Sequence, residues 1–218
     1  THFNMINFNY LIRKFSIMRQ ILIYFICIFL SGNIAKCTPL DGFTLFTPSP
    51  PTAYEETNTY LVNNDSEIIH QWSHPSRCAS TPYLMPDSTL YYPCLITNNY
   101  MQIAAAGGRI LKYSWDGEII WDYTWSGMDF IQHHDIEPLP NGNLLILSNE
   151  RKSMQDAIDR GRINIEGEIW PDMIVEVRPE GLYGGTVVWK WHFWDHLVQN
   201  IDSTKINYGN IQENYGKL

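Results

Sequence analysis

The residues of this chain that are best suited to chemistry are two adjacent histidines, His133 and His134, followed by Asp135. An imidazole can donate or accept a proton near neutral pH and can stabilise a negative charge that develops on an oxygen. Because neighbouring side chains of a regular strand point to opposite faces, we expect His134 on one face and His133 with Asp135 on the other. The alternative is a strand end that three polar side chains cap without any chemical role.

These residues belong to the stretch QHHDIEPLPNGNLLIL, residues 132–147. Its Asn-Gly pair lies between two alternating apolar runs, which is a strong short-range signal for a β-hairpin. A hairpin must therefore position the histidines, with His134 as the first candidate site residue and His133 as the second.

The segment 150–170 interrupts the strand pattern and carries a local group of cations in an otherwise acidic chain. A short helix is expected over Ser153–Asp159, with Gly161 at its end. The cations include Arg160 and Arg162, which could help to bind an anionic substrate. A solvated surface helix is the alternative interpretation.

The other histidines give weaker signals. His196 follows Asp195, and a carboxylate beside an imidazole can fix its tautomer, so His196 is a further candidate for substrate binding. His70 occupies the place that Trp121 has in a repeated pattern, which favours a packing role. His74 precedes a proline and is expected in a loop.

Several classes of site are not indicated. The chain has no HExxH motif and no paired Cys/His spacing for a metal, and it has no GxSxG motif of a serine hydrolase. The glycine pair in AAAGGRIL, residues 104–111, lacks the spacing of a nucleotide-binding loop. We therefore expect neither a metal nor a nucleotide cofactor.

Two patterns recur along the chain and predict repeated hairpins. MPDSTLYY at residue 85 returns as LPNGNLLI at residue 139, and NDSEIIHQW at residue 64 returns as WDGEIIWDY at residue 115, offsets of 54 and 51 residues. A looser third copy of the second pattern is RPEGLYGGTVVWKW, residues 178–191. Repeats of this length with four short strands and periodic tryptophans are typical of β-propeller blades. The predicted fold is all-β, a fragment of about three blades.

Residues 1–35 differ from the rest of the chain. They hold three basic residues and no acidic one, and the ten apolar residues ILIYFICIFL are followed by small residues. This pattern predicts a secretory signal peptide that starts at Met18, after upstream residues, and is cleaved near Ala35. We therefore expect a periplasmic or secreted protein with no membrane segment after cleavage, and a partial propeller over residues 36–218.

Charge and cysteine content narrow the set of partners. The formal net charge is −8, and the part that follows residue 35 is more acidic still, which disfavours nucleic acid and acidic membrane surfaces as partners. Cys78 and Cys94 flank a 15-residue segment and are expected to be structural, with a bridge between them possible in an oxidising compartment. The sequence does not indicate an oligomeric state.

Three segments together resemble the arylsulfotransferase family of exported aryl-sulfate sulfotransferases. They are GGRILKYSWDGEIIWDY, QHHDIEPLPNGNLLIL, and IWPDMIVEVRP with the following GGTVVWKWHFWDHLVQ, and the similarity runs from about Gly42 to about Gly209. The resemblance implies a six-bladed propeller without a cofactor, which transfers a sulfuryl group from a phenolic sulfate ester to a phenol. It also implies a sulfohistidine intermediate, whose nucleophile belongs to later blades that this sequence does not contain.

Carried over to this sequence, the resemblance makes His134, with His133 second, a donor to sulfate oxygens or an acid–base group. Asp135, Arg162, Arg160 and His196 are the predicted substrate-binding residues. Two alternatives stay open. One is a quinone-dependent dehydrogenase propeller, because DGEIIW resembles its tryptophan-bearing repeats, and the other is a propeller that binds a partner without catalysis.

Overall fold

The computed structural model describes residues 19, 40–98, 100–101, 103 and 106–211. The chain divides into two compact units, residues 1–41 and 42–218, and every element below belongs to the second. Apart from Arg19, the expected signal peptide lies outside the described residues. Among the described residues, no helix has the length and apolar character needed to cross a membrane.

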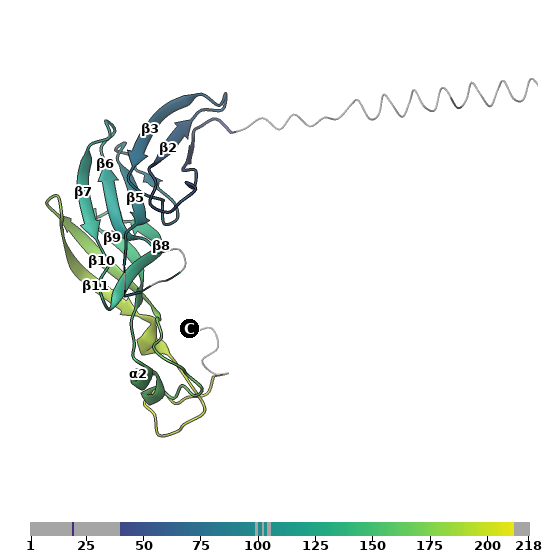
Figure 1. Cartoon of the computed structure of the whole chain (residues 1–218), viewed down its shortest axis with the longest axis vertical. Helices are drawn as coiled ribbons and strands as arrows, with labels where there is room; N and C mark the ends of the chain where they lie inside the picture. The colour runs from purple at the N-terminus through teal and green to yellow at the C-terminus, as the bar shows by residue number, and fades with distance from the viewer. Residues whose placement is uncertain (1–18, 20–39, 99, 102, 104–105, 212–218) are drawn as a thin grey trace, which may run out of the picture. The chain divides into compact units, whose positions relative to one another are not determined.

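Eleven strands of the described residues form three antiparallel sheets (Figure 1). The first sheet contains β1 (Thr44–Phe46), β2 (Thr57–Val62) and β3 (Ile68–His74). The second contains β4 (Tyr83–Leu84), β5 (Leu90–Leu95), β6 (Gly108–Tyr113) and β7 (Ile119–Thr124). The third contains β8 (Phe130–Pro138), β9 (Leu144–Glu150), β10 (Asp172–Glu180) and β11 (Gly184–His192).

The all-β prediction is confirmed, since the described helices are limited to α2 (Met154–Asp159) and the 3₁₀ turn η1 (Phe193–His196). In each sheet the strands follow one another in chain order, as in a blade of a propeller. The strands expected from DGEIIWDYTW and TVVWKW are β7 and β11, and each lies at one edge of its sheet. Closure of the sheets into a propeller ring stays a prediction.

The repeated sequence patterns form the same turn four times. In each five-residue loop, the N–H of the first residue donates to the carbonyl of the fifth, and the N–H of the fourth residue donates to the carbonyl of the first. The loops begin at Asn63, Met85, Ser114 and Leu139. The fourth residue has a positive φ in every case, 65° at Ser66 and Ser88, 85° at Gly117 and 84° at Gly142. Both copies of the first pattern and the first two copies of the second therefore encode the same local conformation, and glycine is best suited to that fourth position.

The outer strands also share an irregularity. In β3, β7 and β11, one residue has no partner on the neighbouring strand. The extra residue stands opposite the step from Leu61 to Val62, from Lys112 to Tyr113, and from Glu176 to Val177. After the bulge, the same position is taken by His70 in β3, Trp121 in β7 and Trp189 in β11. The structural repeat thus agrees with the sequence offsets in turn and in register.

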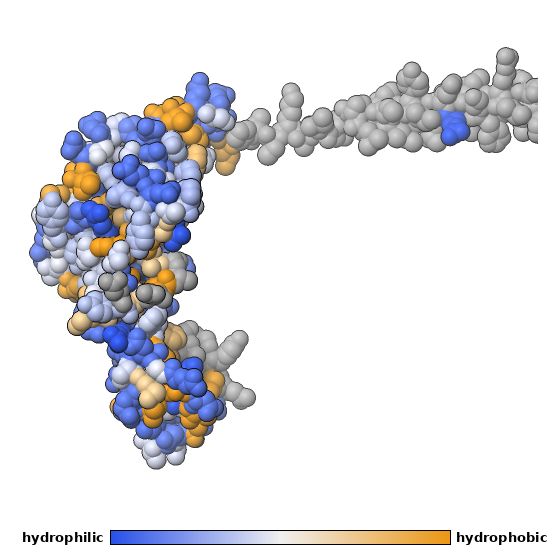
Figure 2. All heavy atoms as spheres, in the orientation of Figure 1, coloured by the Kyte–Doolittle hydropathy of each residue, from blue (hydrophilic) through white to orange (hydrophobic). Residues whose placement is uncertain are grey.

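Apolar side chains gather into two clusters that join neighbouring sheets. Trp72, Leu90, Tyr92 and Leu111 belong to the cluster between the first two sheets. Trp121, Tyr123, Leu144, Ile146 and Val175 belong to the cluster between the second and the third. The outer face in view in Figure 2 is mostly hydrophilic, with separate hydrophobic patches. Burial between sheets is therefore the main favourable term for this fold.

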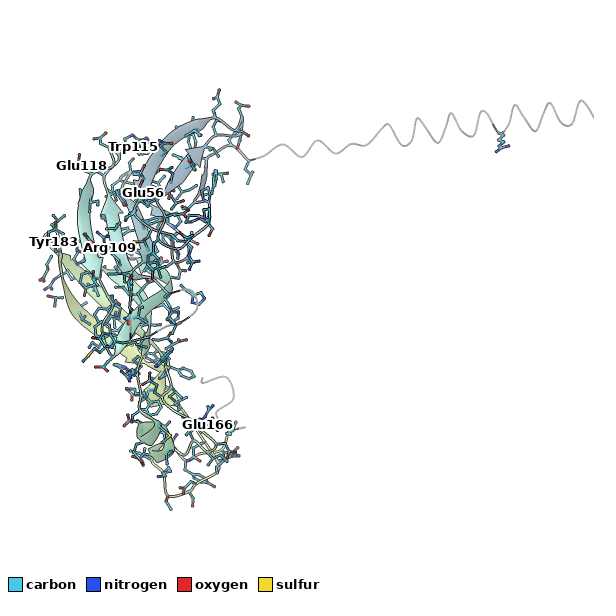
Figure 3. All side chains as sticks on the ribbon, in the orientation of Figure 1. Glu56, Arg109, Trp115, Glu118, Glu166 and Tyr183 are labelled. Carbon is cyan, nitrogen blue, oxygen red and sulfur yellow. The ribbon has the colours of Figure 1, made fainter. Side chains whose placement is uncertain are left out.

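Tryptophans fasten each sheet to the turn of the next sheet. The indole of Trp72 donates to the carbonyl of Ser114 at 3.0 Å, and that of Trp121 donates to the carbonyl of Gly184 at 2.8 Å. Figure 3 shows Trp115 and Tyr183, which lie beside these two acceptors in the β6–β7 and β10–β11 turns. Trp72 and Trp121 therefore pack between neighbouring sheets.

Two histidines of the first sheet are structural. His70 stacks on Trp115 with ring centroids 4.0 Å apart, which confirms its packing role. His74 was expected in a loop and is instead the last residue of β3, where it is buried and stacks on Tyr92 at 3.5 Å. Burial lowers the pKa of His74 to about 3, so the ring is neutral and accepts from or donates to Thr59.

The insert after β9 has the predicted helix. Ser153 caps α2 by accepting from the N–H of Asp156, whose carboxylate accepts from the N–H of Ser153 in return. Gly161 follows the helix with a φ of 86°, a conformation in which a side chain is strained. The short helix therefore begins and ends where the sequence indicates.

Trp121 and Trp189 offer a matched test of packing between sheets. Trp121 is 2% exposed and hydrogen-bonded to the next sheet, whereas Trp189 has the same place in the third sheet and is 47% exposed. We expect Trp121→Ala to lower the free energy of unfolding of the 218-residue chain by about 3–5 kcal/mol. Trp189→Ala should lower it by about 0.5 kcal/mol or less. Urea unfolding measures both, and equal losses would contradict this packing.

Candidate functional site

The two histidines lie in a wide bulge of β8. Gln132 pairs with Ser148 and Ile136 pairs with Ile146, so the three residues between them on β8 stand opposite Leu147 alone. Two extra residues in one strand break the alternation of faces. The expectation of His133 and His134 on opposite faces is therefore wrong: their Nδ1 atoms lie 2.8 Å apart. Bulges of this kind often re-aim side chains beside active sites.

The backbone of His134 is strained. Its φ is 51°, in the left-handed region that residues with a Cβ seldom adopt. Such a conformation costs about 1–2 kcal/mol relative to the right-handed one. His134 is also exposed, so no burial of its ring offsets this cost. A strained, exposed histidine is therefore held by its neighbours, which is a common feature of functional sites.

Gln132 is the neighbour that fixes the start of the bulge. It is fully buried and links β8 to the second sheet through three hydrogen bonds. Its side-chain Oε1 accepts from the N–H of Gly108 at 2.8 Å, its carbonyl accepts from Gly107 at 3.0 Å, and its N–H donates to Trp125 at 2.9 Å. We call this set of bonds the Gln132 clamp.

The glycine pair of AAAGGRIL makes the clamp possible. A Cβ on Gly107 would lie 1.8 Å from Oε1 of Gln132 and 2.9 Å from Cβ of Ala79. A Cβ on Gly108, which has a φ of 99°, would lie 2.5 Å from Ile96. These glycines therefore serve close packing between strands.

Asp135 anchors the other end of the bulge. Its Oδ1 accepts from the hydroxyl of Tyr83 in β4 at 2.8 Å and from the N–H of Ile136 at 3.0 Å. Burial and this hydrogen bond to a carboxylate raise the pKa of Tyr83 to about 12, so its hydroxyl remains a donor at neutral pH. Two donors on one oxygen give Asp135 a structural attachment to the second sheet.

His133 lies between His134 and the carboxylate of Asp172. Its ring is buried, and its Nε2 lies 3.2 Å from Oδ1 of Asp172, although the approach is not aligned for a hydrogen bond. The same Oδ1 accepts from the side-chain amide of Asn149 at 2.7 Å. Burial lowers the pKa of His133 and outweighs the opposing effect of Asp172, so this ring is neutral at neutral pH.

These contacts define the tautomers of both rings. A carboxylate oxygen beside Nε2 of His133 repels a lone pair and favours a proton there, which leaves Nδ1 of His133 as an acceptor. Nδ1 of His134 then donates the single proton that the two Nδ1 atoms share. The exposed Nε2 of His134 is consequently left with a lone pair, ready to accept a proton from a bound molecule.

An apolar hollow lies beside the bulge. It has a volume of about 220 Å³ and is lined by Leu145, Leu147 and Ile174, together with Asp135, Ile136 and Glu137. Its walls come from β8, β9 and β10 of the third sheet. The hollow adjoins the bulge through Asp135, whereas neither His133 nor His134 is among its lining residues.

The remaining predicted site residues lie elsewhere among the described residues. Arg160 and Arg162 line a different cavity, of about 370 Å³, in which the guanidinium of Arg160 lies over Trp194 at 5.3 Å. His196 stacks on Trp191 at 4.8 Å, and Asp195 lies 3.7 Å from Arg160. No hydrogen bond or ion pair of the described residues joins these side chains to the bulge, so the structure brings together only His133, His134 and Asp135.

Sequence reasoning missed three contributors, Tyr83, Gln132 and Asp172. Gln132 directly precedes the histidines, and Tyr83 lies in the segment STPY that the repeat aligns with them, so each left a faint signal. Asp172 lies 38 residues after His134 and left no signal in the sequence, because only strand pairing brings it close to the histidines. No three His, Cys, Asp or Glu side chains of the described part are arranged to hold a metal ion.

Gly107→Ala tests the clamp. The added Cβ would overlap the side chain of buried Gln132, so we expect a loss of at least about 2–3 kcal/mol of stability. Gly117→Ala is the control, because its Cβ would meet nothing within 4 Å and only its φ of 85° adds a cost of about 1 kcal/mol. Chemical unfolding of both variants measures the difference, and a Gly107→Ala variant as stable as the control would contradict the clamp.

Comparison with known proteins assigns the chain to a family. It matches none of the curated proteins with which it was compared. Residues 52–217 match the family described as Arylsulfotransferase (ASST). This range includes the Gln132 clamp, the histidine bulge, and all of the second and third sheets. The match covers most of the chain, and the chain therefore belongs to the arylsulfotransferase family.

Proposed function

We propose that this chain takes part in transfer of a sulfuryl group from a phenolic sulfate ester to a phenol. Family membership supports an arylsulfotransferase-type activity. The observation that carries the finer proposal is the exposed, strained His134, whose Nδ1 is engaged by His133 and whose Nε2 has no partner among the described residues. The apolar wall of Leu145, Leu147 and Ile174 offers a surface for an aryl ring.

His134 has the acid–base role in this proposal, since the family resemblance gives the nucleophile to another histidine. In the first half-reaction, the nucleophilic histidine forms a bond to sulfur while the S–O bond of the donor ester breaks and its electron pair goes to the aryl oxygen. The imidazolium form of His134 donates its Nε2 proton to that oxygen, or to a sulfate oxygen that becomes more negative. In the second half-reaction, the acceptor phenol attacks sulfur while its proton goes to Nε2 of His134, and the S–N bond breaks with its electron pair returning to the nucleophilic histidine.

His133 and Asp172 support this cycle from behind. Neutral His133 accepts from Nδ1–H of His134, which orients the ring and stabilises the positive charge when His134 is protonated. Asp172 fixes the tautomer of His133. Asp135 is a positioning residue in this scheme, because its Oδ1 accepts from the hydroxyl of Tyr83 and from the N–H of Ile136. Direct contact of this carboxylate with the sulfate would be repulsive.

Arg160, Arg162 and His196 are left out of this scheme. They line or adjoin a separate cavity and have no contact with the bulge among the described residues. Nothing in the site favours the quinone-dependent alternative. A binding propeller without catalysis would need no acid–base group at residue 134, so substitution of that residue separates the two functions.

His134→Asn is the direct test, since asparagine tolerates a left-handed backbone but cannot shuttle a proton. With the full-length protein, a chromogenic aryl sulfate and a phenol acceptor, we expect turnover to fall about 100-fold or more. Added imidazole should restore part of the activity by replacing the missing base. The same substitution at His70, which packs on Trp115 in the first sheet, is the control and should change turnover little.

Unchanged unfolding midpoints for His134→Asn are needed, and circular dichroism measures them. If the variant retains full turnover, the histidine pair only caps the bulge and the proposed role is wrong. If turnover falls but imidazole restores none of it, the loss has a structural cause and the acid–base assignment fails.

A further inference from the structure

Two cysteines face each other across neighbouring segments of the second sheet. Cys94 lies in β5, and Cys78 lies in the connection from β3 to β4, where the two form an isolated antiparallel bridge as free thiols. The bridge is flanked by two hydrogen bonds, from the N–H of Ala79 to Pro93 at 2.9 Å and from the N–H of Leu95 to Arg77 at 3.0 Å. The cysteines themselves therefore form the non-hydrogen-bonded kind of pair.

Pairs of this kind bring their side chains closest. Their Cα atoms are about 4.5 Å apart in antiparallel sheets. Disulfides span Cα separations of about 4.4–6.8 Å, so this register suits a bond without a shift of either segment. We propose that Cys78 and Cys94 form a disulfide that fastens the connection between the first and second sheets to β5. This proposal does not depend on the activity proposed above.

The surroundings of the pair fit a structural bond. Cys94 is fully buried in the cluster between the first two sheets, and Cys78 packs against that cluster. The same connection is already docked on β5, because the hydroxyl of Ser76 donates to Leu95 and the hydroxyl of Tyr92 donates to Ser76, each at 2.9 Å. A disulfide would lock a contact that hydrogen bonds have already positioned.

The bond would also support the histidine bulge. Ala79, which follows Cys78, is one of the two residues that a Cβ on Gly107 would meet, together with Gln132, so it packs beside the Gln132 clamp. The connection continues into β4, whose Tyr83 holds Asp135. Burial, and to a lesser degree the charge of Asp135, raises the pKa of Cys78. Fixing Cys78 therefore fixes the segment that carries Tyr83, the hydrogen-bond partner of Asp135.

Formation of the bond is expected while the chain folds. Burial raises the pKa of Cys78 to about 12 and that of Cys94 to about 11, so the folded thiols hold little reactive thiolate. The oxidant is a small disulfide such as glutathione disulfide. One cysteine attacks it and expels a glutathione thiol, and the other cysteine then attacks the mixed disulfide and expels the second. Two thiols thus lose two electrons and two protons, and the oxidant is reduced to two thiols.

The experiment is refolding of the full chain in a glutathione redox buffer. Remaining thiols are blocked with N-ethylmaleimide after denaturation, and the protein is digested without reductant for mass spectrometry. We expect a cross-linked pair of peptides that contains Cys78 and Cys94, lighter by two hydrogen atoms than the reduced pair. Cys78→Ser should leave Cys94 fully labelled, and Cys37→Ser should leave the cross-link intact.

Thermal unfolding gives an independent readout. The midpoint of the oxidised chain should lie about 5–10 °C above that of the chain reduced with dithiothreitol, because the bond closes a loop of about 15 residues. The doubly substituted Cys78→Ser, Cys94→Ser chain should not respond to the reductant. Full labelling of both cysteines after oxidative refolding would overturn the proposal, as would a cross-link from Cys37 to either one. Because the peptide map uses the unsubstituted chain, it decides even if a variant fails to fold.

Discussion

The candidate site depends on the burial of one amide side chain, that of Gln132. Its oxygen accepts from a backbone N–H of the second sheet, and its own backbone continues the pairing between sheets on both sides. A buried amide that lost these partners would cost about 1–3 kcal/mol, so the clamp is a strong constraint on how β8 meets β6. Residues 133–135, which follow it on β8, stand opposite Leu147 alone, and the chain bulges there at the histidine pair.

The bulge gives the two histidines different environments although they are neighbours in sequence. His133 is turned inward, neutral, and next to Asp172, while His134 is turned outward in a strained conformation. Direct contact between their Nδ1 atoms then couples the buried ring to the exposed ring. A regular strand would have separated the rings on opposite faces, and neither would have influenced the proton on the other.

Features that depend on local sequence could be predicted from the sequence. The four turns follow from the types of residue that tolerate positive φ, as Gly117 and Gly142 show, and the capped helix follows from Ser153. The alternating apolar runs predicted the strands, including those that carry the tryptophans between the sheets. The histidine pair itself was found because two adjacent imidazoles at the head of a hairpin have no role in the repeat.

Features that depend on pairing between distant segments could not be predicted. The bulge exists because residues 133–135 face Leu147 alone, and no property of those residues predicts this register. The prediction of His74 in a loop was wrong because its ring packs on Tyr92, 18 residues away. This packing overrides the loop signal of Pro75, which follows His74. The predicted grouping of Arg160 and Arg162 with the histidines was based on charge alone, and charge does not specify which cavity a side chain lines.

The protonation of the two imidazoles tests this account most directly, and long-range proton–nitrogen NMR correlation measures it with nitrogen-15 in the histidine rings. For the neutral rings we predict a proton on Nε2 of His133 and on Nδ1 of His134, with Nε2 of His134 unprotonated. His133→Asn, compared with the unsubstituted chain, assigns the signals. The opposite pattern, a proton on Nδ1 of His133 and on Nε2 of His134, would contradict the coupling of Asp172, His133 and His134 from which the proposed role of His134 follows.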